Sequence, residues 1–569
     1  MIKELYKLWC EKAVNDPDLI EELKEMQGNE ELISDAFYTN LEFGTAGLRG
    51  VIGAGTNRMN IYTVGQASQG LAEYVKSITE NGSVAIAYDS RIKSDTFAKT
   101  AAAIFAANKI KVYLYSELMP TPMLSFAVRR LKCDAGVVVT ASHNPSKYNG
   151  YKAYGADGAQ LGPEAADFVM SIMQKIDVFD GIKTTDFDTA VENGQIEYIG
   201  QDIIEEYLDC VEAGRVEKDT DLSGLKVVYT PLNGAGNKPV RAILKRLGIT
   251  DVYVVPEQEY PDGNFPTAPY PNPEIRQAFE CALKLAEETN PDILLATDPD
   301  SDRVGIAVRI NGEYKLFSGN DVGVLLLNYI LERRKANGTL PKEPVAVKTI
   351  VSTELCQKIA DAYGCKLINV LTGFKFIGEQ ISILAEQNEP ERFIFGYEES
   401  YGYLTGDYAR DKDAVVGSML ICEMTAYYKT QGKTLGDVLN EIYEKHGYFR
   451  DAQVSFTCEG QSGMEKIKNI MQSLRANPPS VVDGDKVICV KDYLNSTSVD
   501  TLSGEETVLT LPKSNVLSYF LDSGCSLIVR PSGTEPKIKI YIGAVGSTAE
   551  LADAKKESII KAGTELLGF

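Results

Sequence analysis

Short apolar runs alternate with amphipathic stretches along most of the chain. Residues 83–89 and 345–350 are apolar enough to form buried strands, and the stretches that follow them, 96–108 and from Thr353 onward, have the spacing of amphipathic helices. A further apolar run at 225–229 ends in a turn sequence. Strands that alternate with helices are typical of parallel α/β layers. The pattern therefore predicts an α/β protein, in which each of these strands could open one of three similar mixed α/β domains.

The C-terminal part of the chain has a different pattern. Apolar stretches follow one another closely there, at 452–456, 486–490, 507–511 and 538–542. Closely spaced strands favour antiparallel pairing, so we expect a C-terminal α+β domain. Stretches rich in charged and turn residues mark the seams between domains at 214–224, 311–321 and 445–451. The expected domains are residues 1–213, 214–318, 319–446 and 447–569.

Composition narrows the class of protein. Of the 569 residues, 44% are hydrophobic and 24% are charged, so the chain can build several packed cores. The formal net charge of −22 disfavours nucleic acid and anionic membranes as partners. An anionic substrate would therefore need local Lys and Arg side chains that overcome a repulsive field.

Cysteine and histidine usage indicates a reducing compartment and no zinc site. Ten cysteines are scattered without any Cys-x-x-Cys spacing, as is typical of buried free thiols, and there are two histidines. The N-terminus is amphipathic and lacks the apolar core of a signal peptide. The longest apolar run, Val322 to Leu331, is shorter than the roughly 20 residues that span a bilayer. We expect a soluble, cytoplasmic protein without a membrane partner.

A serine follows the apolar run 137–139, in Thr140-Ala141-Ser142-His143-Asn144-Pro145. Strand ends are where α/β sheets place ligands, and Pro145 and Gly150 are expected to force turns around Ser142. Neighbouring side chains on extended backbone point apart, so the sequence does not imply a Ser142–His143 pair, and the motif is not Gly-x-Ser-x-Gly. A strand-ending serine turn is the structural alternative to a reactive serine.

Three carboxylates follow a second apolar strand, in Asp298-Pro299-Asp300-Ser301-Asp302-Arg303. Clustered carboxylates repel one another unless a cation compensates, and oxygen ligands without histidine suit Mg²⁺ or Ca²⁺. An EF-hand is excluded, because its sixth position holds Arg303 and its twelfth holds Arg309. A metal site is the preferred interpretation, and an acidic cluster that begins a helix is the alternative. Arg303 could hold a phosphate beside it.

Four further segments carry candidate polar or charged side chains. Glu398 and Ser400 lie between glycines in 395–402 and could hydrogen-bond a polyol, although a polar hairpin turn would look the same. Asp411-Lys412-Asp413 could supply an acid or base, or form a solvated charge run. Arg530, Ser532 and Thr534 in 530–537 have the composition of an oxyanion cradle, which a plain β-turn could also have. Arg49 lies in a similar Gly-Thr-Ala-Gly-Leu-Arg-Gly segment.

A serine, a metal triad, a polyol-binding loop and phosphate cradles together fit phosphoryl transfer on a sugar phosphate. In this order and at this spacing, the motifs Thr-Ala-Ser-His-Asn-Pro, Asp-Pro-Asp-x-Asp-Arg, Gly-x-Glu-Glu-Ser-x-Gly and Arg-x-Ser-Gly-Thr resemble those of the α-D-phosphohexomutase superfamily. They look most like the phosphoglucomutase / phospho-sugar mutase branch, and the resemblance covers nearly the whole chain. It implies four domains around a central active-site cleft, each of which contributes one loop.

The resemblance also implies a role for each motif. Ser142 would carry the phosphoryl group and, with its phosphate, would hold Mg²⁺ together with Asp298, Asp300 and Asp302. The sugar hydroxyls would be bound by Glu398, Ser400, Thr372 and Gly373, and the phosphate that is not transferred by Arg530, Ser532, Gly533 and Thr534. Basic positions around the transferred phosphoryl group would be Arg49, His143, Lys152, Arg303 and Lys412. Lys412 and His143 are the two hypotheses for the group that takes the proton of the attacking sugar hydroxyl.

The implied activity is phosphoglucomutase, which interconverts α-D-glucose 1-phosphate and glucose 6-phosphate through a glucose 1,6-bisphosphate intermediate. Phosphopentomutase, phosphomannomutase or glucose 1,6-bisphosphate synthase of the same family is the alternative, because Tyr397 and the 530–539 segment resemble a branch with mixed sugar preference. A catalytically silent binder and a phosphatase are alternatives of other classes. Sugar phosphates are the expected partners, and the sequence does not choose between a monomer and a dimer.

Overall fold

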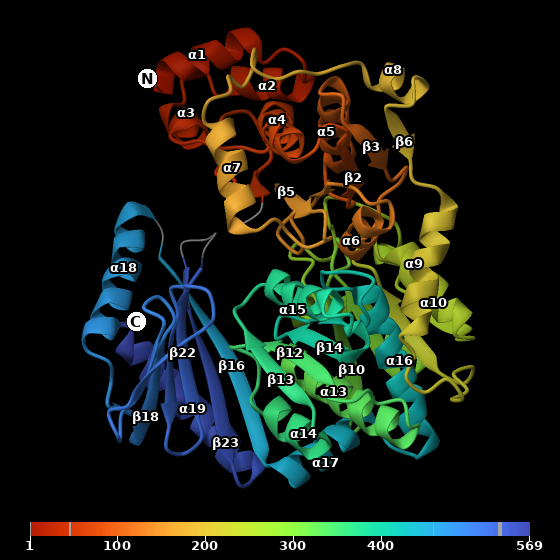
Figure 1. Ribbon diagram of the computed structural model, residues 1–569, viewed down its shortest axis with the longest axis vertical. Coiled ribbons are helices and arrows are strands. Elements are labelled where there is room, and N and C mark those ends of the chain that lie inside the picture. Colours follow the sequence, from red (N-terminus) through yellow and green to blue (C-terminus); the bar gives the residue numbers. More distant parts are fainter. Residues whose placement is uncertain (1, 45–46, 459, 533–536) are drawn as a thin grey trace. The chain divides into compact units, whose positions relative to one another are not determined.

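The structure is a computed structural model that describes residues 2–44, 47–458, 460–532 and 537–569 (Figure 1). The chain forms two compact units. The first comprises Met1–Gly319, Ile377–Gly396 and Ser400–Gly432, and the second comprises Asn320–Phe376, Tyr397–Glu399 and Lys433–Phe569. Within the described residues, no helix is both long and apolar enough to cross a membrane.

Three N-terminal helices pack around the only tryptophan of the chain. They are α1 (Ile2–Lys12), α2 (Pro17–Glu25) and α3 (Glu30–Phe37). Trp9 is fully buried, and the rings of Phe37, Tyr62 and Phe179 meet it edge to face at centroid distances of 5.7, 5.6 and 5.3 Å. Tyr62 belongs to the following helix, α4 (Ile61–Ile78), so this aromatic cluster attaches the three helices to the first α/β layer.

The first sheet has the strand order β1-β5-β4-β2-β3-β6. Strands β2, β3, β4 and β6 pair in parallel, and β5 and β1 are antiparallel additions at one edge. Buried positions run through β2 and β4 without alternation, as expected for strands that are covered on both faces. The elements are β1 (Gly47–Val51), β2 (Ser83–Tyr88), α5 (Ser94–Ala107), β3 (Lys111–Leu114), α6 (Thr121–Arg130), β4 (Ala135–Val139), β5 (Tyr148–Gly155), α7 (Pro163–Met173), α8 (Phe187–Glu192) and β6 (Ile196–Tyr198).

The second sheet, in the same unit, has the order β11-β10-β9-β7-β8. Its strands β7, β8 and β9 are parallel, and β10 and β11 are antiparallel, so it repeats the mixed design of the first sheet. The elements are α9 (Gln201–Ala213), β7 (Lys226–Thr230), α10 (Asn237–Arg246), β8 (Asp251–Val254), α11 (Pro256–Glu259), η1 (Arg276–Phe279), α12 (Glu280–Thr289), β9 (Ile293–Thr297), β10 (Val304–Ile310) and β11 (Glu313–Leu316).

The third segment again alternates strands and helices, and its β12 and β13 pair in parallel. Its elements are α13 (Gly319–Ala336), β12 (Val345–Thr349), α14 (Leu355–Tyr363), β13 (Lys366–Val370), α15 (Phe374–Glu386), η2 (Pro390–Arg392), β14 (Phe393–Glu398), β15 (Gly402–Leu404), α16 (Ala414–Thr430) and α17 (Leu435–His446). The mixed α/β class expected from the alternation of strands and helices is confirmed.

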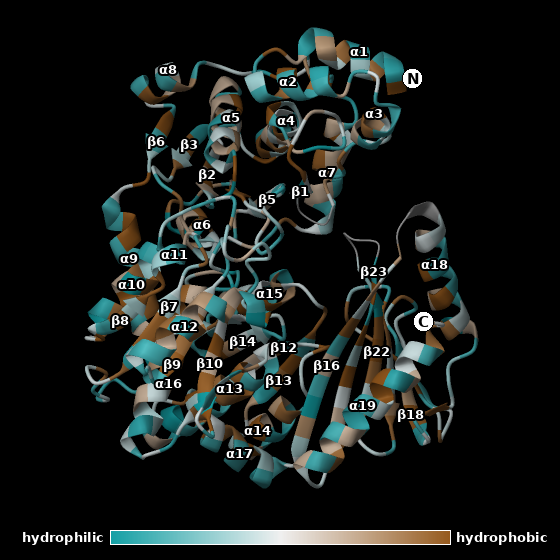
Figure 2. Cartoon of the chain, turned by 180° about the vertical axis from the view of Figure 1, so that it is seen from behind, coloured by the Kyte–Doolittle hydropathy of each residue, from teal (hydrophilic) through white to brown (hydrophobic). Residues whose placement is uncertain are grey.

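The C-terminal part is an antiparallel sheet with the order β16-β23-β22-β21-β18-β19-β20 and with β17 paired to β18. Hydrophobic residues line β22 and β23 (Figure 2). The expected strand 507–511 extends too far toward the C-terminus, because the observed strand β20 ends at Val508. All three residues of β20 are exposed. The elements are β16 (Tyr448–Thr457), α18 (Gly460–Ala476), β17 (Val481–Val482), β18 (Asp485–Asp492), β19 (Thr497–Asp500), β20 (Glu506–Val508), β21 (Leu517–Leu521), β22 (Ser526–Pro531), β23 (Lys537–Gly546) and α19 (Ala549–Leu566).

Gly150 is not in a turn, contrary to the expectation from the sequence. It lies inside β5, opposite Arg49 of β1. A Cβ atom at this position would lie 2.5 Å from the Thr140 carbonyl oxygen and 2.9 Å from the Leu48 carbonyl oxygen. Glycine is therefore required by the close approach of the backbone segments on either side of β5.

We expect Gly150→Ala to lower the stability of the first unit by about 2 kcal/mol or more, because its methyl group would have to displace backbone rather than a flexible side chain. Thermal unfolding followed by circular dichroism measures the effect. Gly162→Ala is the matched control, since nothing lies within 4 Å of a Cβ atom at Gly162 and its φ is −67°. Equal melting temperatures for the two variants would contradict this account.

Candidate active site

Ser142 follows β4 and has a left-handed backbone with φ of 52°. The residue is 4% exposed, and its N–H group donates a hydrogen bond of 2.8 Å to Thr140 Oγ1. Thr140 Oγ1 in turn donates to Asp89 Oδ2 at 2.6 Å. A non-glycine residue in this conformation is uncommon and persists only when its surroundings hold it, so the serine loop is built around one backbone geometry.

His143 is in contact with the serine. Its Nδ1 lies 3.1 Å from Ser142 Oγ, so the expectation that the two side chains point apart was wrong. That expectation assumed extended backbone, and the left-handed φ of Ser142 removes the assumption. Burial, followed by the charges of Arg303 and Arg49, lowers the pKa of His143 well below its usual value. The imidazole next to Ser142 is therefore neutral at physiological pH. Arg49, one of these two arginines, lies in β1 and is exposed.

Asp298, Asp300 and Asp302 converge in the loop after β9. All three are buried, and one carboxylate oxygen from each lies within 4.8 Å of the others. Asp298 Oδ1 accepts hydrogen bonds from the N–H groups of Asp302 and Arg303 at 3.1 and 3.0 Å. Ser142 Oγ donates to Asp298 Oδ2 at 2.8 Å, which joins the serine loop of the first sheet to the carboxylate loop of the second.

Two lysines balance part of this negative charge. Lys152 Nζ lies 2.7 Å from Asp300 Oδ2 and 3.4 Å from Asp302 Oδ2, and Lys412 Nζ lies 3.2 Å from Asp302 Oδ2. Although burial raises it, these cations and Arg303 hold the pKa of Asp302 below its usual range. Arg303 is also paired with Glu274 Oε1 at 2.6 Å. The structure thus brings these three basic residues of the expected site together at the carboxylates.

The carboxylate cluster fits a divalent cation. Burial and the charges of Asp300 and Asp302 raise the pKa of Asp298 well above its usual value, so the neighbouring lysines and Arg303 do not fully compensate the negative charge at Asp298. Within the part of the chain that the structure describes, Asp300 Oδ1 and Asp302 Oδ1 are buried and have no hydrogen-bond partner. Asp300 Oδ2, by contrast, accepts from Thr121 Oγ1 and Lys152 at 2.7 Å each. Buried carboxylate oxygens without a donor are the ligands that Mg²⁺ prefers.

Lys412 is held by its surroundings as well as by Asp302. Asp411 Oδ1 accepts from the Lys412 N–H at 2.8 Å, and Tyr154 donates to Asp411 Oδ2 at 2.7 Å. A Cβ atom at Gly402 would lie 2.0 Å from Lys412 Cδ, so the lysine stem runs directly over this glycine. The segment 411–413 is therefore a fixed part of the site and not a solvated charge run.

Sequence reasoning missed several residues that shape the site, chief among them Arg91, Thr121 and Tyr154. Thr121, which begins α6, donates from its N–H to the Asp300 carbonyl oxygen at 2.9 Å and from Oγ1 to the Asp300 carboxylate. Arg91 lies just after β2, the strand next to β4, and contacts the serine loop. The only signal in the sequence was its place at a strand end, where α/β sheets collect functional groups.

Two of the expected sugar-binding residues, Glu398 and Gly373, are joined by a hydrogen bond in the second unit. Glu398 is 4% exposed, and its Oε1 accepts a hydrogen bond of 2.7 Å from the N–H group of Gly373. The backbone of Gly373 has a positive φ of 124°. Thr372 Oγ1 is buried without a hydrogen-bond partner among the described residues. Burial and the charge of Glu398 raise the pKa of the neighbouring Glu399 to about 7. Ser400, in the first unit, is half-buried.

The expected phosphate-binding residues lie in the hairpin of β22 and β23. Arg530 donates to the hydroxyl of Tyr541 at 3.4 Å, and the Ser532 N–H donates to the Lys537 carbonyl oxygen at 2.8 Å. Gly533 and Thr534 lie outside the described residues. The hairpin presents an arginine and a serine hydroxyl at one end of the C-terminal sheet, which is compatible with an anion site.

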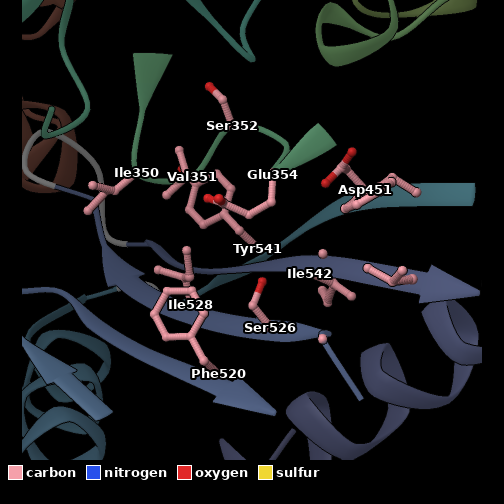
Figure 3. A pocket seen from close by; sticks show the side chains of 14 residues that line it. Ile350, Val351, Ser352, Glu354, Asp451, Phe520, Ser526, Ile528, Tyr541 and Ile542 are labelled. Carbon is pink, nitrogen blue, oxygen red and sulfur yellow. The ribbon is translucent and has the colours of Figure 1, made fainter. Parts of the chain in front are cut away.

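A cavity of ≈ 20 Å³, with room for about one water molecule, lies near this hairpin in the second unit (Figure 3). Ser352, Glu354, Asp451, Ser526 and Tyr541 are among its lining residues. Burial, together with the charges of Asp321 and Glu354, raises the pKa of Asp451 to about 7, although Thr353 and Lys348 act in the opposite direction. A carboxyl group that is easier to protonate in the folded state makes stability depend on pH.

We expect the melting temperature of Asp451→Asn, relative to wild type, to rise by about 2–4 °C between pH 5 and pH 8. The pKa of Asp451 is raised in the folded state, so its contribution to stability is present below the usual pKa of the carboxyl and is lost as the pH rises through about 7. Asparagine cannot ionise and avoids this loss. Differential scanning calorimetry of both proteins, with the exposed Asp219→Asn as control, measures the trend. A difference that stays flat with pH would exclude it.

Comparison with known proteins gives four family matches, all named phosphoglucomutase/phosphomannomutase. They are alpha/beta/alpha domain I at residues 40–179, domain II at 205–311, domain III at 318–446 and the C-terminal domain at 491–560. The chain is 39% identical over 511 residues to the phosphoglucomutase of Staphylococcus haemolyticus, which covers 89% of this chain and 90% of that protein. It is 38% identical over 542 residues to that of Staphylococcus aureus, which covers 94% and 95%.

Solved structures show the same fold at lower identity. A putative phosphomannomutase from Thermus thermophilus superposes with a TM-score of 0.69 at 22% identity and covers 93% of this chain and 100% of its own. The open form of the exocytosis-sensitive phosphoprotein parafusin from Paramecium, a phosphoglucomutase, gives a TM-score of 0.69 at 17% identity and covers 93% and 95%.

Proposed function

Because the chain belongs to the phosphoglucomutase/phosphomannomutase family, we propose that it interconverts α-D-glucose 1-phosphate and glucose 6-phosphate. The observation that carries the proposal is the hydrogen bond between Ser142 and Asp298, which puts a buried serine hydroxyl against three carboxylates that Lys152 and Lys412 flank. The phosphoglucomutases of two staphylococci, at 38–39% identity over most of the chain, support glucose as the sugar. Phosphopentomutase, phosphomannomutase and bisphosphate synthase are not favoured by these relatives.

Phosphoryl transfer needs mainly positioning and charge stabilisation from the protein. In the first half of the proposed reaction, a sugar hydroxyl attacks the phosphorus carried by Ser142. The bond between phosphorus and Ser142 Oγ breaks and the bond to the sugar oxygen forms. The sugar hydroxyl gives up its proton, Ser142 Oγ takes one up as it leaves, and glucose 1,6-bisphosphate results. In the second half, the bisphosphate has reversed its orientation, and Ser142 Oγ attacks the other phosphate of the bisphosphate. The bond between that phosphorus and the sugar oxygen breaks, and the sugar oxygen regains a proton.

Asp298, Asp300 and Asp302 are proposed to hold Mg²⁺ together with the phosphate on Ser142. The buried, hydrogen-bond-free oxygens of Asp300 and Asp302 and the close approach of all three carboxylates support this assignment. When bound, Mg²⁺ would supply charge that stabilises the transferred phosphoryl group. Lys152 and Lys412, which already contact the same carboxylates, would hold the remaining phosphoryl oxygens on the protein side. Arg49 and Arg303 would add charge from their places around His143.

Proton transfer is proposed to involve His143 and Lys412. The contact of 3.1 Å between His143 Nδ1 and Ser142 Oγ supports His143 as the group that takes the serine proton when Ser142 attacks. Lys412 and His143 remain the two candidates for the proton of the attacking sugar hydroxyl. Full turnover by Lys412→Ala would remove Lys412 from this role.

Substrate binding is proposed to use the remaining expected residues, with one loop from each of the domains 1–213, 214–318, 319–446 and 447–569 around a central cleft. Glu398, Ser400, Thr372 and Gly373 would bind the sugar hydroxyls. The buried and unpartnered Thr372 Oγ1 supports this, because it lacks a donor or acceptor in the described chain. Arg530, Ser532, Gly533 and Thr534 would bind the phosphate that is not transferred. Ten free cysteines support a reducing, cytoplasmic location.

A coupled assay tests the proposal. Wild-type protein is mixed with glucose 1-phosphate, Mg²⁺ and a catalytic amount of glucose 1,6-bisphosphate, and glucose 6-phosphate is followed through its dehydrogenase. We expect sustained turnover that exceeds the turnover of mannose 1-phosphate and ribose 1-phosphate. A higher kcat/KM for either competitor would move the assignment to the corresponding mutase, and release of inorganic phosphate without isomerisation would indicate a phosphatase.

A further inference from the structure

Arg91 is a buried cation behind the serine loop. Arg91 as a whole is 3% exposed, and its side chain is fully buried. A guanidinium group without water needs partners for its donors, since burial alone disfavours the charge. Burial lowers the pKa of Arg91, and the negative charges of Asp89, Asp300 and Asp298 act against that shift.

The donors of Arg91 are used on the loop that carries Ser142. Nη1 donates to the carbonyl oxygens of Pro145 and Tyr148 at 3.0 Å each, and Nη2 donates to those of Ser142 and Asn144. Four carbonyl groups of one seven-residue segment, 142–148, are therefore directed at a single planar group. One of them belongs to Ser142 itself, so Arg91 holds the Ser142 carbonyl group while the hydroxyl of the same residue contacts Asp298 and His143.

Asp89 holds the guanidinium in place and connects it to the same loop by a second route. Asp89 Oδ2 lies 3.4 Å from Arg91 Nε and accepts from Thr140 Oγ1 at 2.6 Å, while Thr140 Oγ1 accepts from the Ser142 N–H. Asp89 Oδ1 accepts from the Arg91 N–H at 2.9 Å. Both the N–H and the carbonyl group of Ser142 thus depend on the Asp89–Arg91 pair.

Residues 263–265, which precede the carboxylate loop along the chain, pack against Arg91. The ring of Phe265 lies 5.1 Å from the guanidinium carbon, within the range of a cation–π contact. Phe265 is fully buried, and a Cβ atom at the nearby Gly263 would lie 2.5 Å from the Ile92 nitrogen. The segment 263–265 therefore packs directly on Arg91 and its neighbour, and it belongs to the part of the chain that also carries Asp298, Asp300 and Asp302.

We propose that Arg91 is a positioning residue for phosphoryl transfer: it fixes Ser142 in its left-handed conformation and, through Phe265, keeps the serine in register with the carboxylate cluster. This inference rests on the proposed function. Lysine cannot replace arginine here, because an ammonium group has three donors around one point and cannot reach four carbonyl oxygens that face a planar fork. Arg91 contacts neither reacting atom, so its loss changes the placement of Ser142 and leaves the residues proposed to bind substrate intact.

The test compares Arg91→Lys with wild type in the coupled assay. We expect kcat to fall about 100-fold, as for a reacting group displaced by about 1 Å, while KM for glucose 1-phosphate changes less than about threefold. Intact mass after incubation with glucose 1,6-bisphosphate should show slower phosphorylation of Ser142. Arg215→Lys is the control, since Arg215 is a partly buried arginine that is also paired with a buried carboxylate, Glu423 at 2.9 Å, and it lies outside the serine loop. It should keep its kcat.

Two further variants guard against a folding defect. In Arg91→Ala, free guanidinium ion at non-denaturing concentration should restore part of the lost kcat, which a general loss of structure would not allow. Phe265→Leu should lower kcat about fivefold at unchanged KM. If Arg91→Lys does not fold, this variant tests whether the packing on Arg91 positions Ser142. A folded Arg91→Lys with kcat within threefold of wild type, or an equal loss in Arg215→Lys, overturns the inference. Absence of turnover in wild type would instead reject the proposed function.

Discussion

Ser142→Ala should abolish the interconversion of the two glucose phosphates, with kcat lower by a factor of about 10⁴ or more. The reason is that alanine has no oxygen to carry the phosphoryl group between the two halves of the reaction, and a residue that forms the covalent intermediate cannot be bypassed by binding alone. The coupled assay measures the loss, and mass spectrometry after incubation with glucose 1,6-bisphosphate should find phosphate on wild type and none on the variant.

Stability should change little in Ser142→Ala, because the lost hydroxyl contacts only Asp298 and His143 within the described residues. Ser418→Ala is the matched control. Its hydroxyl is also buried but has no hydrogen-bond partner in the described part of the chain, so its removal should leave kcat unchanged. Residual turnover of Ser142→Ala above about 1% of wild type would show that another residue carries the phosphoryl group.

Asp298→Asn should lower kcat by about 10²- to 10³-fold and weaken the response to Mg²⁺. In wild type, saturation with Mg²⁺ at about 100 times its Kd should stabilise the fold by about 2.7 kcal/mol. The variant should lose most of this gain, because one of three oxygen ligands becomes a neutral amide. Melting temperature as a function of Mg²⁺ concentration reports binding without relying on activity.

The same substitution should not destabilise the metal-free protein. Three carboxylate oxygens within 4.8 Å repel one another, and removing one charge relieves that repulsion. The amide oxygen of the introduced asparagine can still accept from the N–H groups of Asp302 and Arg303, as the carboxylate does now. The exposed Asp167→Asn controls for loss of one surface charge. If Asp298→Asn kept the full Mg²⁺-dependent gain in melting temperature, the carboxylate cluster would not be the metal site.

Strand ends were the most reliable guide from sequence to site. Ser142 and Asp298 each follow an apolar run, and the rule that α/β sheets place functional groups at strand ends predicted both loops. Each loop leaves the end of a strand in its own sheet, and the hydrogen bond between Ser142 and Asp298 joins the two loops. The rule predicts where groups gather, but it does not state which donor faces which acceptor.

Conformation and burial were harder to predict. The contact of Ser142 with His143 depends on the positive φ of Ser142. Glycine is the residue that suggests a positive φ in a sequence, and serine does not. Arg91 was missed because its partners are backbone carbonyls, which look the same in every sequence. Gly150 was assigned to a turn, since the sequence could not reveal that the backbone at Thr140 and at Leu48 crowds it from two sides. In each case the missing information is a contact between segments distant along the chain or a backbone angle that such contacts impose.

The lone tryptophan gives the N-terminal helices an optical label of their own. Trp9 lies among the rings of Phe37, Tyr62 and Phe179 and is shielded from water, so its emission should be blue-shifted and should report on that cluster alone. Tryptophan fluorescence during unfolding would therefore follow the detachment of α1 to α3, whereas circular dichroism follows all the sheets and helices. Where the two transitions separate, the N-terminal helices open independently of the layer that carries Ser142.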